Sequence, residues 1–335
     1  MHILFDIGHP AHVHLYRNFI KELVARGEKV TVTSRDKEVT NALLNHYGIE
    51  YINLSTPAPS KIGMGLELLS RDYQILKQHR KDPVSISFGT SVSIAHLSAV
   101  SGVPSIVSNE DDDDVVPLFT KLTYPFATQI INPVEIIFDK WTKKRKIVHS
   151  YHELAYLHPS NFKVKQDVCE KYGFKPGEFI LYRASALRAH HDSGILGLNS
   201  LRSELSDLLD GYQVLSSDEL SKSQFKPWEL HQLLASAKFI ITDSQTMSVE
   251  AAILGVPCLR FNSFADSCSI IKSLEDEYNL IKSFMPGRDN EDFLRMVKHY
   301  LNSDHLKKTN QVNREEMLHQ KIDYNIVLNN IVNEF

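Results

Sequence analysis

Three histidines close to the N-terminus could carry acid–base chemistry. His9, His12 and His14 lie in a nine-residue stretch, residues 6–14, that follows an apolar strand pattern and leads into a helical one. Histidine is the side chain best suited to accept a proton near neutral pH. The stretch therefore predicts a general base after the first strand, although a histidine here could instead cap the helix or pack against the sheet.

A second stretch has the features of an anion site. Residues 239–242 are apolar, small polar residues follow, and a helical pattern starts at once. The first N–H groups of a helix lack intrahelical acceptors and carry the positive end of its dipole, so they bind anions. We expect phosphate contacts here from Ser244, Gln245, Thr246 and Met247. Glu250, one turn further on, either accepts hydrogen bonds from vicinal hydroxyls such as those of a ribose or only complements the helix dipole.

Two arginines follow the first strand pattern of the second half of the chain. Arg183 and Arg188 could clamp a diphosphate, because a guanidinium matches the spacing of phosphate oxygens; a plain surface loop is the other interpretation. His190, His191 and Asp192 are neighbours in the chain and lack the spacing of metal ligands. We therefore predict no metal site and no cofactor.

The order of these patterns predicts a doubly wound α/β fold. Short apolar or β-branched strands alternate with helical stretches up to residue 131, and the alternation restarts at residue 179. Strands separated by helices favour parallel βαβ units, and 335 residues suit two domains. We place one Rossmann-like domain at residues 1–148 and a second at 149–320, with a C-terminal helix at 321–335 that packs back on the first domain. Gly27 is expected to end a helix, and Gly255 to form the turn that leads into the next strand.

Composition and charge narrow the class of protein. Apolar residues make up 42 % of the chain and charged residues 23 %, as in ordinary soluble proteins. The 37 basic and 41 acidic residues give a net charge of -4, which argues against nucleic-acid binding. Three cysteines predict a reducing compartment rather than a disulfide framework. With no secretory signal and no apolar run long enough to span a bilayer, the expected location is cytoplasmic; peripheral contact with the inner membrane face stays open, because one amphipathic surface is enough for it.

Several motifs resemble known families. The stretch from Thr242 to Pro257, with Glu250 inside it, is similar to the nucleotide-binding motif of GT-B glycosyltransferases and of the non-hydrolysing UDP-GlcNAc 2-epimerases. Over nearly the whole chain, the motifs resemble those of bacterial and archaeal predicted glycosyltransferases; they lie at residues 6–14, 153–159, 183–192 and 242–257. The resemblance implies the GT-B fold, in which two Rossmann-like domains face each other across a cleft, and a hexosyl- or N-acetylhexosaminyl-transferase.

The resemblance also implies roles for particular residues. It places the diphosphate at residues 244–247 and the ribose at Glu250, and the register of residues 12–27 against inverting transferases makes His12 the base, with His9 as second choice. In those families the loop before residue 229 contacts the nucleobase of the donor, and the loop after residue 261 reaches the donor sugar. These loops make Trp228 and Asp266 donor-binding candidates.

A run of acidic residues in the first half could face the acceptor. Residues 110–114 are all Asp or Glu, a pattern that usually indicates a solvated, self-repelling loop. We interpret the run as lining the acceptor side of the cleft, with Glu110 or Asp111 as acceptor contacts.

The resemblance thus implies inverting, metal-independent transfer from a nucleotide-diphosphate sugar, with a UDP-sugar as first candidate, to a glycan or glycolipid hydroxyl in surface polysaccharide or glycolipid synthesis. One alternative is a 2-epimerase-like isomerase; against it, the loop Phe88 to Ser91 lacks the aspartate of the epimerase loop, and Gln245-Thr246 replaces a glycine pair. The other alternative is a non-catalytic nucleotide-sugar-binding protein. The presence of His12 and Glu250 argues against it.

Overall fold

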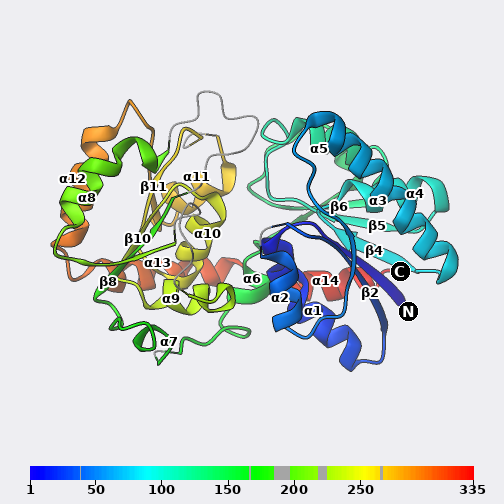
Figure 1. Ribbon diagram of the computed structural model, residues 1–335, viewed down its shortest axis with the longest axis horizontal. Coiled ribbons are helices and arrows are strands. Elements are labelled where there is room, and N and C mark those ends of the chain that lie inside the picture. Colours follow the sequence, from blue (N-terminus) through cyan, green and yellow to red (C-terminus); the bar gives the residue numbers. More distant parts are fainter. Residues whose placement is uncertain (38, 166, 185–196, 218–224, 265–266) are drawn as a thin grey trace. The chain divides into compact units, whose positions relative to one another are not determined.

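The computed structural model describes the chain except for residues 38, 166, 185–196, 218–224 and 265–266. The chain forms two compact units, one of Met1–Asn161 with Ile322–Phe335 and one of Phe162–Lys321. The first unit extends beyond the predicted boundary at residue 148, because the segment that follows packs on its helices: Asn18 of the first helix donates to the Ala155 carbonyl at 2.8 Å. Each unit is built on a parallel sheet covered by helices, which confirms the predicted fold class (Figure 1).

The first sheet has the order β3-β2-β1-β4-β5-β6-β7, and all its strands run parallel. The strands are β1 (His2–Ile7), β2 (Lys29–Arg35), β3 (Ile52–Ser55), β4 (Ile86–Gly89), β5 (Ser105–Ser108), β6 (Gln129–Pro133) and β7 (Arg145–Val148). The strand order reverses between β1 and β4, and such a reversal is where open α/β sheets bind ligands. The loops that follow these two strands are therefore the first place to look for a site.

Two layers of helices cover this sheet (Figure 1). One layer consists of α1 (Pro10–Ala25), α2 (Thr40–His46), α6 (Leu154–Leu157) and α14 (Tyr324–Val332), and the other of α3 (Lys61–Lys81), α4 (Val92–Ser101) and α5 (Pro117–Thr123); a 3₁₀ turn, η1 (Thr142–Lys144), precedes β7. The last helix of the chain, α14, is part of the first unit. Its Tyr324 hydroxyl donates to Ser108 at 3.0 Å and its Asn325 amide donates to the Ala155 carbonyl at 2.8 Å.

The second sheet has the order β12-β11-β10-β8-β9 and is also parallel throughout. Its strands are β8 (Phe179–Arg183), β9 (Gln213–Ser216), β10 (Phe239–Thr242), β11 (Cys258–Phe261) and β12 (Ile281–Phe284). Here the order reverses between β8 and β10. The loops after β8 and β10 carry the predicted arginines and the predicted phosphate site.

The helices of the second unit also lie on both faces of their sheet (Figure 1). One face carries η2 (Leu198–Leu201), α8 (Arg202–Leu209) and α12 (Asn290–Leu301), and the other α7 (Asp167–Glu170), η3 (Pro227–Glu229), α9 (Leu230–Ser236), α10 (Gln245–Leu254), α11 (Ser269–Asp276) and α13 (Leu306–Gln320). Gly27, after α1, and Gly255, after α10, have φ of 80° and 67°, as helix-ending glycines do. Among the described residues, no helix is both long enough and apolar enough to cross a membrane.

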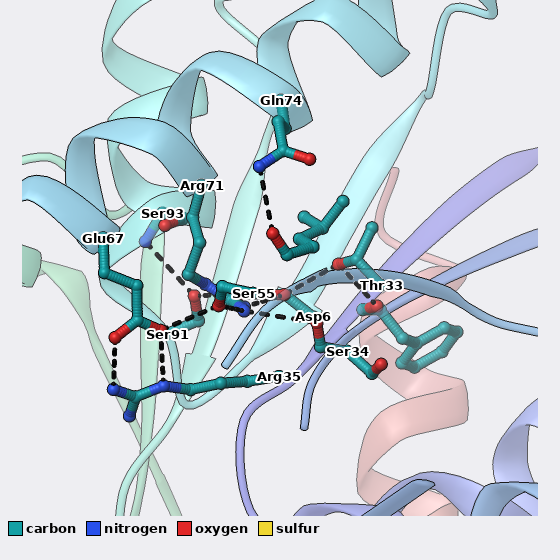
Figure 2. Close-up of polar contacts among 12 residues, drawn as sticks. Asp6, Thr33, Ser34, Arg35, Ser55, Glu67, Arg71, Gln74, Ser91 and Ser93 are labelled. Carbon is teal, nitrogen blue, oxygen red and sulfur yellow. Dashed lines mark hydrogen bonds and ion pairs between the residues drawn. The ribbon is translucent and has the colours of Figure 1, made fainter. Parts of the chain in front are cut away.

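A buried carboxylate joins four elements of the first unit (Figure 2). Asp6, at the end of β1, accepts hydrogen bonds on Oδ1 from Arg71 of α3 at 2.6 Å and from Thr33 of β2 at 2.7 Å. The hydroxyl of Ser91, which caps α4, donates to Oδ2. A buried charge is tolerated only when it is paired and hydrogen-bonded, so this network fixes the end of β1.

The same inner face of α3 carries a second ion pair. Arg35 of β2 forms two hydrogen bonds of 2.7 Å with the carboxylate of Glu67, which also accepts from the Ser55 hydroxyl at 2.7 Å (Figure 2). The charged residues in the middle of α3 are thus turned toward the sheet.

Replacing the buried arginine should destabilise the first unit strongly. Arg71→Met leaves the Asp6 carboxylate buried without its cation, a change that costs about 3–5 kcal/mol. Lys29→Met removes the partner of Asp82 on the surface of the same unit and should change little, because exposed ion pairs are screened by water. Urea unfolding of both variants and wild type measures this. Equal losses in the two variants would contradict the role given to Asp6, and Asp6→Asn combined with Arg71→Met should recover part of the loss.

Candidate active site

The first helix begins at the predicted histidine loop, and His9 is its cap. Pro10 occupies the first helical position, where its missing N–H costs nothing. His9 Nδ1 accepts from the Ala11 N–H at 3.2 Å, so His9 does the work that Ser or Asp usually does at such a position. Burial, with a further contribution from Lys37, lowers the pKa of His9 to about 4. His9 therefore has a structural role that His12 does not share.

His12 lies one turn into the same helix and is half-buried. Among the described residues, its Nδ1 atom is buried without a hydrogen-bond partner. Burial and the neighbouring His9 lower the pKa of His12 to about 3, although the Asp6 carboxylate acts in the opposite direction. The ring is thus neutral, which is the form that accepts a proton, and a nearby carboxylate stabilises the cation that would form.

A group of acidic and basic side chains gathers near His12 at the same edge of the sheet. Glu110 follows β5, and it accepts a hydrogen bond from the His152 main-chain N–H and lies 3.3 Å from His152 Nδ1. Burial raises the pKa of Glu110 well above its usual value, and the neighbouring Glu153 adds to this by repulsion and by a side-chain hydrogen bond. The raised pKa favours the neutral, protonated form of the Glu110 carboxyl group.

His152 completes this group. Burial lowers the pKa of His152 well below its usual value, and His12 contributes to the shift, so the two rings lie within electrostatic reach of each other. Among the described residues, His152 Nε2 is also buried without a hydrogen-bond partner. The first unit therefore gathers two neutral imidazoles and two neighbouring carboxyl groups, a set that can take up and release protons.

The acidic run is not the solvated loop that its composition indicates. Glu110 is bound to His152, Asp112 accepts from the Ile137 N–H at 3.0 Å, and Asp113 pairs with Arg145 at 2.5 Å. Partners from distant segments therefore offset the repulsion within the run. Asp111, the other predicted acceptor contact, is half-buried, and its carbonyl accepts from the Asn109 amide at 2.8 Å.

The second unit places a helix N-terminus at the predicted phosphate stretch. Ser244 caps α10, and its hydroxyl accepts from the Met247 N–H at 3.4 Å. Because that N–H already has an acceptor, Met247 is a poorer phosphate ligand than predicted. Thr246 is half-buried, and its N–H belongs to the first turn, whose donors have no intrahelical acceptor. Gln245 and Thr246 are therefore the first-turn residues best placed for a phosphate.

Glu250 is almost fully buried on α10 and is held by a histidine of α9. His231 Nε2 and Glu250 Oε1 are 2.9 Å apart, and both side chains are buried. The bond fixes the direction of the carboxylate, which makes His231 a positioning residue for it. A glutamate that only complemented the helix dipole would not need a buried partner, so this geometry favours the ribose interpretation.

Two arginines lie level with the end of β10. In the strand register, Thr242 pairs with Arg183 of β8 on one side and with Arg260 of β11 on the other. Arg183 is half-buried and donates to the Ser217 carbonyl at 2.8 Å. Arg260 is only 1 % exposed, and its Nε and Nη1 atoms have no hydrogen-bond partner among the described residues. Burial lowers the pKa of Arg260, while Glu275 and Asp243 oppose this, so the arginine brings a poorly compensated positive charge to the strand ends.

The structure describes only one of the remaining predicted donor-binding residues. Trp228 lies in η3, half-buried, with Lys226 Nζ 5.6 Å from the centre of its ring, so it is not a core residue. Arg188 and Asp266 lie outside the described residues, as do His190, His191 and Asp192. In the part of the chain that is described, no three His, Cys, Asp or Glu side chains are arranged to hold a metal ion.

Comparisons with known proteins agree with this architecture. Residues 1–165 match the family model described as "Protein of unknown function (DUF354)", and no curated protein matches the chain in sequence. The UDP-GlcNAc 2-epimerase from Methanocaldococcus jannaschii, solved with UDP-GlcNAc and UDP, is 14 % identical with a TM-score of 0.68, over 94 % of this chain and 99 % of that one. The spinosyn rhamnosyltransferase SpnG, complexed with thymidine diphosphate, is 12 % identical with a TM-score of 0.66, over 99 % of this chain and 100 % of that one. The chain has the GT-B fold.

A third GT-B structure is similar to the same extent. The UDP-GlcNAc 2-epimerase from Neisseria meningitidis, bound to UDP-GlcNAc, is 14 % identical with a TM-score of 0.68, over 95 % of this chain and 100 % of that one. At such low identity the likeness concerns the fold, and both transferases and epimerases share it. The chemistry must therefore be argued from the residues at the strand ends of this GT-B chain.

Sequence reasoning missed several of these residues. Glu153 begins the motif at residues 153–159 and His152 directly precedes it, but the motif indicates no role for either residue. His152 binds Glu110, which lies 42 residues earlier in the chain. Arg260 and His231 have no local signal, since a single Arg in a strand or His in a helix is common. An arginine inside an otherwise apolar strand of four residues was the one available hint.

His12→Gln should reduce the acid sensitivity of the first unit. Folding holds the pKa of His12 at about 3 against 6.5 in the unfolded chain, so below pH 6.5 protons bind preferentially to the unfolded chain and favour unfolding. At about pH 5 this one side chain lowers the free energy of unfolding by about 2 kcal/mol relative to neutral pH. Urea unfolding at both pH values should show the same loss in wild type and in His149→Gln, an exposed histidine of the same unit. The loss should be smaller by about 2 kcal/mol in His12→Gln, in which His9 and His152 still favour unfolding in acid. An unchanged pH dependence in His12→Gln would contradict the environment described here.

Proposed function

We propose that this chain is a glycosyltransferase that moves a sugar from a nucleotide-diphosphate donor, with a UDP-sugar as first candidate, to a hydroxyl group. The observation that carries the proposal is the group at the carboxyl edge of the second sheet. It combines the N-terminus of α10, the arginine Arg183 and a buried Glu250 fixed by His231. Solved GT-B structures that hold UDP, UDP-GlcNAc and thymidine diphosphate support a nucleotide in this fold.

The donor diphosphate would bind at the start of α10. When the sugar leaves, negative charge grows on the diphosphate, and preorganised dipoles and cations stabilise such charge most effectively. The first-turn N–H groups, Arg183 and the charge of Arg260 would supply this stabilisation. These groups can take the place of a divalent cation, so we propose a metal-independent reaction without a cofactor.

The acceptor hydroxyl would lose its proton to His12. Direct displacement by that hydroxyl inverts the configuration at the sugar carbon and needs one base. His12 is neutral and lies on the helix that follows β1, and the buried carboxylate of Asp6 would stabilise its protonated form. His9 is the weaker candidate, because its Nδ1 lone pair already caps the helix.

We further propose that the acceptor is a glycan or glycolipid and that the enzyme works in the cytoplasm in surface polysaccharide or glycolipid synthesis, with peripheral contact at the inner membrane face. Glu110 is proposed as an acceptor contact because its carboxyl group lies with the histidines at the edge of the first sheet. No nucleic-acid partner is proposed.

Calorimetric titration of UDP, GDP, CMP and dTDP tests the donor site. One nucleotide should bind in the presence of EDTA, and Glu250→Ala should weaken it by more than about 1.5 kcal/mol, roughly tenfold. Glu291→Ala, a first-turn glutamate at the exposed start of α12, serves as the matched control and should bind as wild type does.

Three results of this titration would count against the proposal. Absence of binding by every nucleotide, or equal binding by Glu250→Ala and wild type, would remove the donor site. Binding that EDTA abolishes would remove the metal-independent mechanism.

A second candidate function is a nucleotide-sugar isomerase. The observation that favours it is the neighbouring carboxyl groups of Glu110 and Glu153 beside His152, since inverting a C–H centre needs groups that remove and return a proton. The loop Phe88 to Ser91 lacks the aspartate of the epimerase loop, yet the hydroxyl of Ser91 donates to the carboxylate of Asp6. Acid–base groups are thus present at this edge even though the predicted loop lacks one.

Incubation of UDP-sugars in D₂O without acceptor separates the two functions. An isomerase exchanges the hydrogen at the inverted carbon with solvent, whereas a transferase leaves the C–H bonds of its donor intact. We expect no deuterium in recovered donor by mass spectrometry. Incorporation that Glu110→Gln abolishes would favour the isomerase, and binding without turnover on any glycan or glycolipid acceptor would favour a binding protein.

A further inference from the structure

Helix α3 turns large apolar side chains toward solvent. Ile62, Leu66, Leu69 and Tyr73 are between 63 % and 80 % exposed. Their spacing of four, three and four residues places them along one face of the helix. The opposite face packs on the sheet through Arg71 and Ile75, both buried. The usual pattern of a surface helix, apolar inward and polar outward, is therefore reversed over the first three turns.

The exposed charges carried by α3 itself are all of one sign. Glu67 is turned inward to Arg35, and Asp72 binds His96 of α4 at 2.7 Å. The exposed charged residues along α3 are basic: Lys61 at its start and Lys77, Arg80 and Lys81 in its last turns. A contiguous apolar face on a folded protein usually marks an interaction site, and basic residues at both ends select a negatively charged partner.

Neighbouring helices of the same layer add to the surface. His96 of α4 joins α3 to α5, because its ring binds both Asp72 and the Leu122 carbonyl, and Phe126 packs on its edge at 5.4 Å. Leu118 of α5 is 65 % exposed, and Lys121, one turn later, is exposed as well. Apolar side chains flanked by lysine thus recur on the outer side of this layer.

We propose that the outer face of α3 docks on the surface of an anionic lipid bilayer. Ile62, Leu66, Leu69 and Tyr73 would enter the boundary between headgroups and acyl chains, and the lysines and arginine would contact lipid phosphates. This is the arrangement by which interfacial helices bind membranes, with the helix lying in the plane of the surface. The inference rests on the peripheral membrane contact proposed above and names the surface that brings the first unit to a lipid-borne acceptor.

A second copy of the chain fits this face less well. In a two-fold contact the same surface meets itself, so basic residues at both ends of the apolar face would oppose basic residues in either orientation of the helices. No carboxylate on the exposed face of α3 compensates them, since Glu67 and Asp72 are turned inward. A bilayer that contains anionic lipid supplies both the apolar interior and the negative charge.

Vesicle flotation tests this inference. Wild type should float with vesicles of phosphatidylcholine and phosphatidylglycerol, less at high salt, and only weakly with phosphatidylcholine alone. Leu66→Ser/Leu69→Ser should weaken binding on the order of tenfold or more, since two large side chains no longer leave water. The matched control Val24→Ser/Val312→Ser, two exposed valines of α1 and α13, should float as wild type does.

Further measurements keep the outcomes distinct. Urea unfolding of Leu66→Ser/Leu69→Ser should match wild type, which shows that the first unit is folded, and nucleotide calorimetry tests the donor site of the second unit separately. The inference is overturned if wild type does not float with anionic vesicles or if this variant floats equally well. It is also overturned, in favour of self-association, if sedimentation shows a dimer that the variant converts to monomers.

Discussion

The carboxylate of Asp6 is the contact on which one edge of the first unit depends. Its hydrogen bonds come from β2, α3 and the cap of α4, and it stands at the end of β1, where the strand order reverses. His12 lies in the first turn of the helix that follows the same strand, and the charge of Asp6 acts to raise its pKa. The interaction that holds four elements together therefore also sets the electrostatics of the candidate base, so fold and chemistry are not separable at this edge.

Patterns that are local in the sequence predicted much of the architecture. The alternation of strands and helices, the helix start near Ser244 and the turn at Gly255 depend on residues within one or two turns of each other. Edge strands β7 and β12 were missed because lysine, arginine or serine interrupts their apolar pattern. Such residues are stable there because an edge strand is less deeply buried than a central one.

Contacts between distant residues account for what the sequence did not predict about the candidate site. Arg71 meets Asp6 across 65 residues, and His231 meets Glu250 across 19. Nothing in either partner's surroundings indicates the other, because the parallel sheet alone brings the strand ends and covering helices together. The acidic run shows the same limit. Its composition alone predicts a loop whose charges repel each other, whereas in the fold three of its carboxylates bind three different partners.

The first unit is completed by the last segment of the chain. Tyr324 and Asn325 fill positions beside Ser108 and Ala155 that residues 1–161 leave uncovered by themselves. During synthesis this unit emerges first, yet its last helix is translated only after the whole second unit. The first unit must therefore wait, with its sheet complete and one side of α1 uncovered, until all of the second unit has been synthesised.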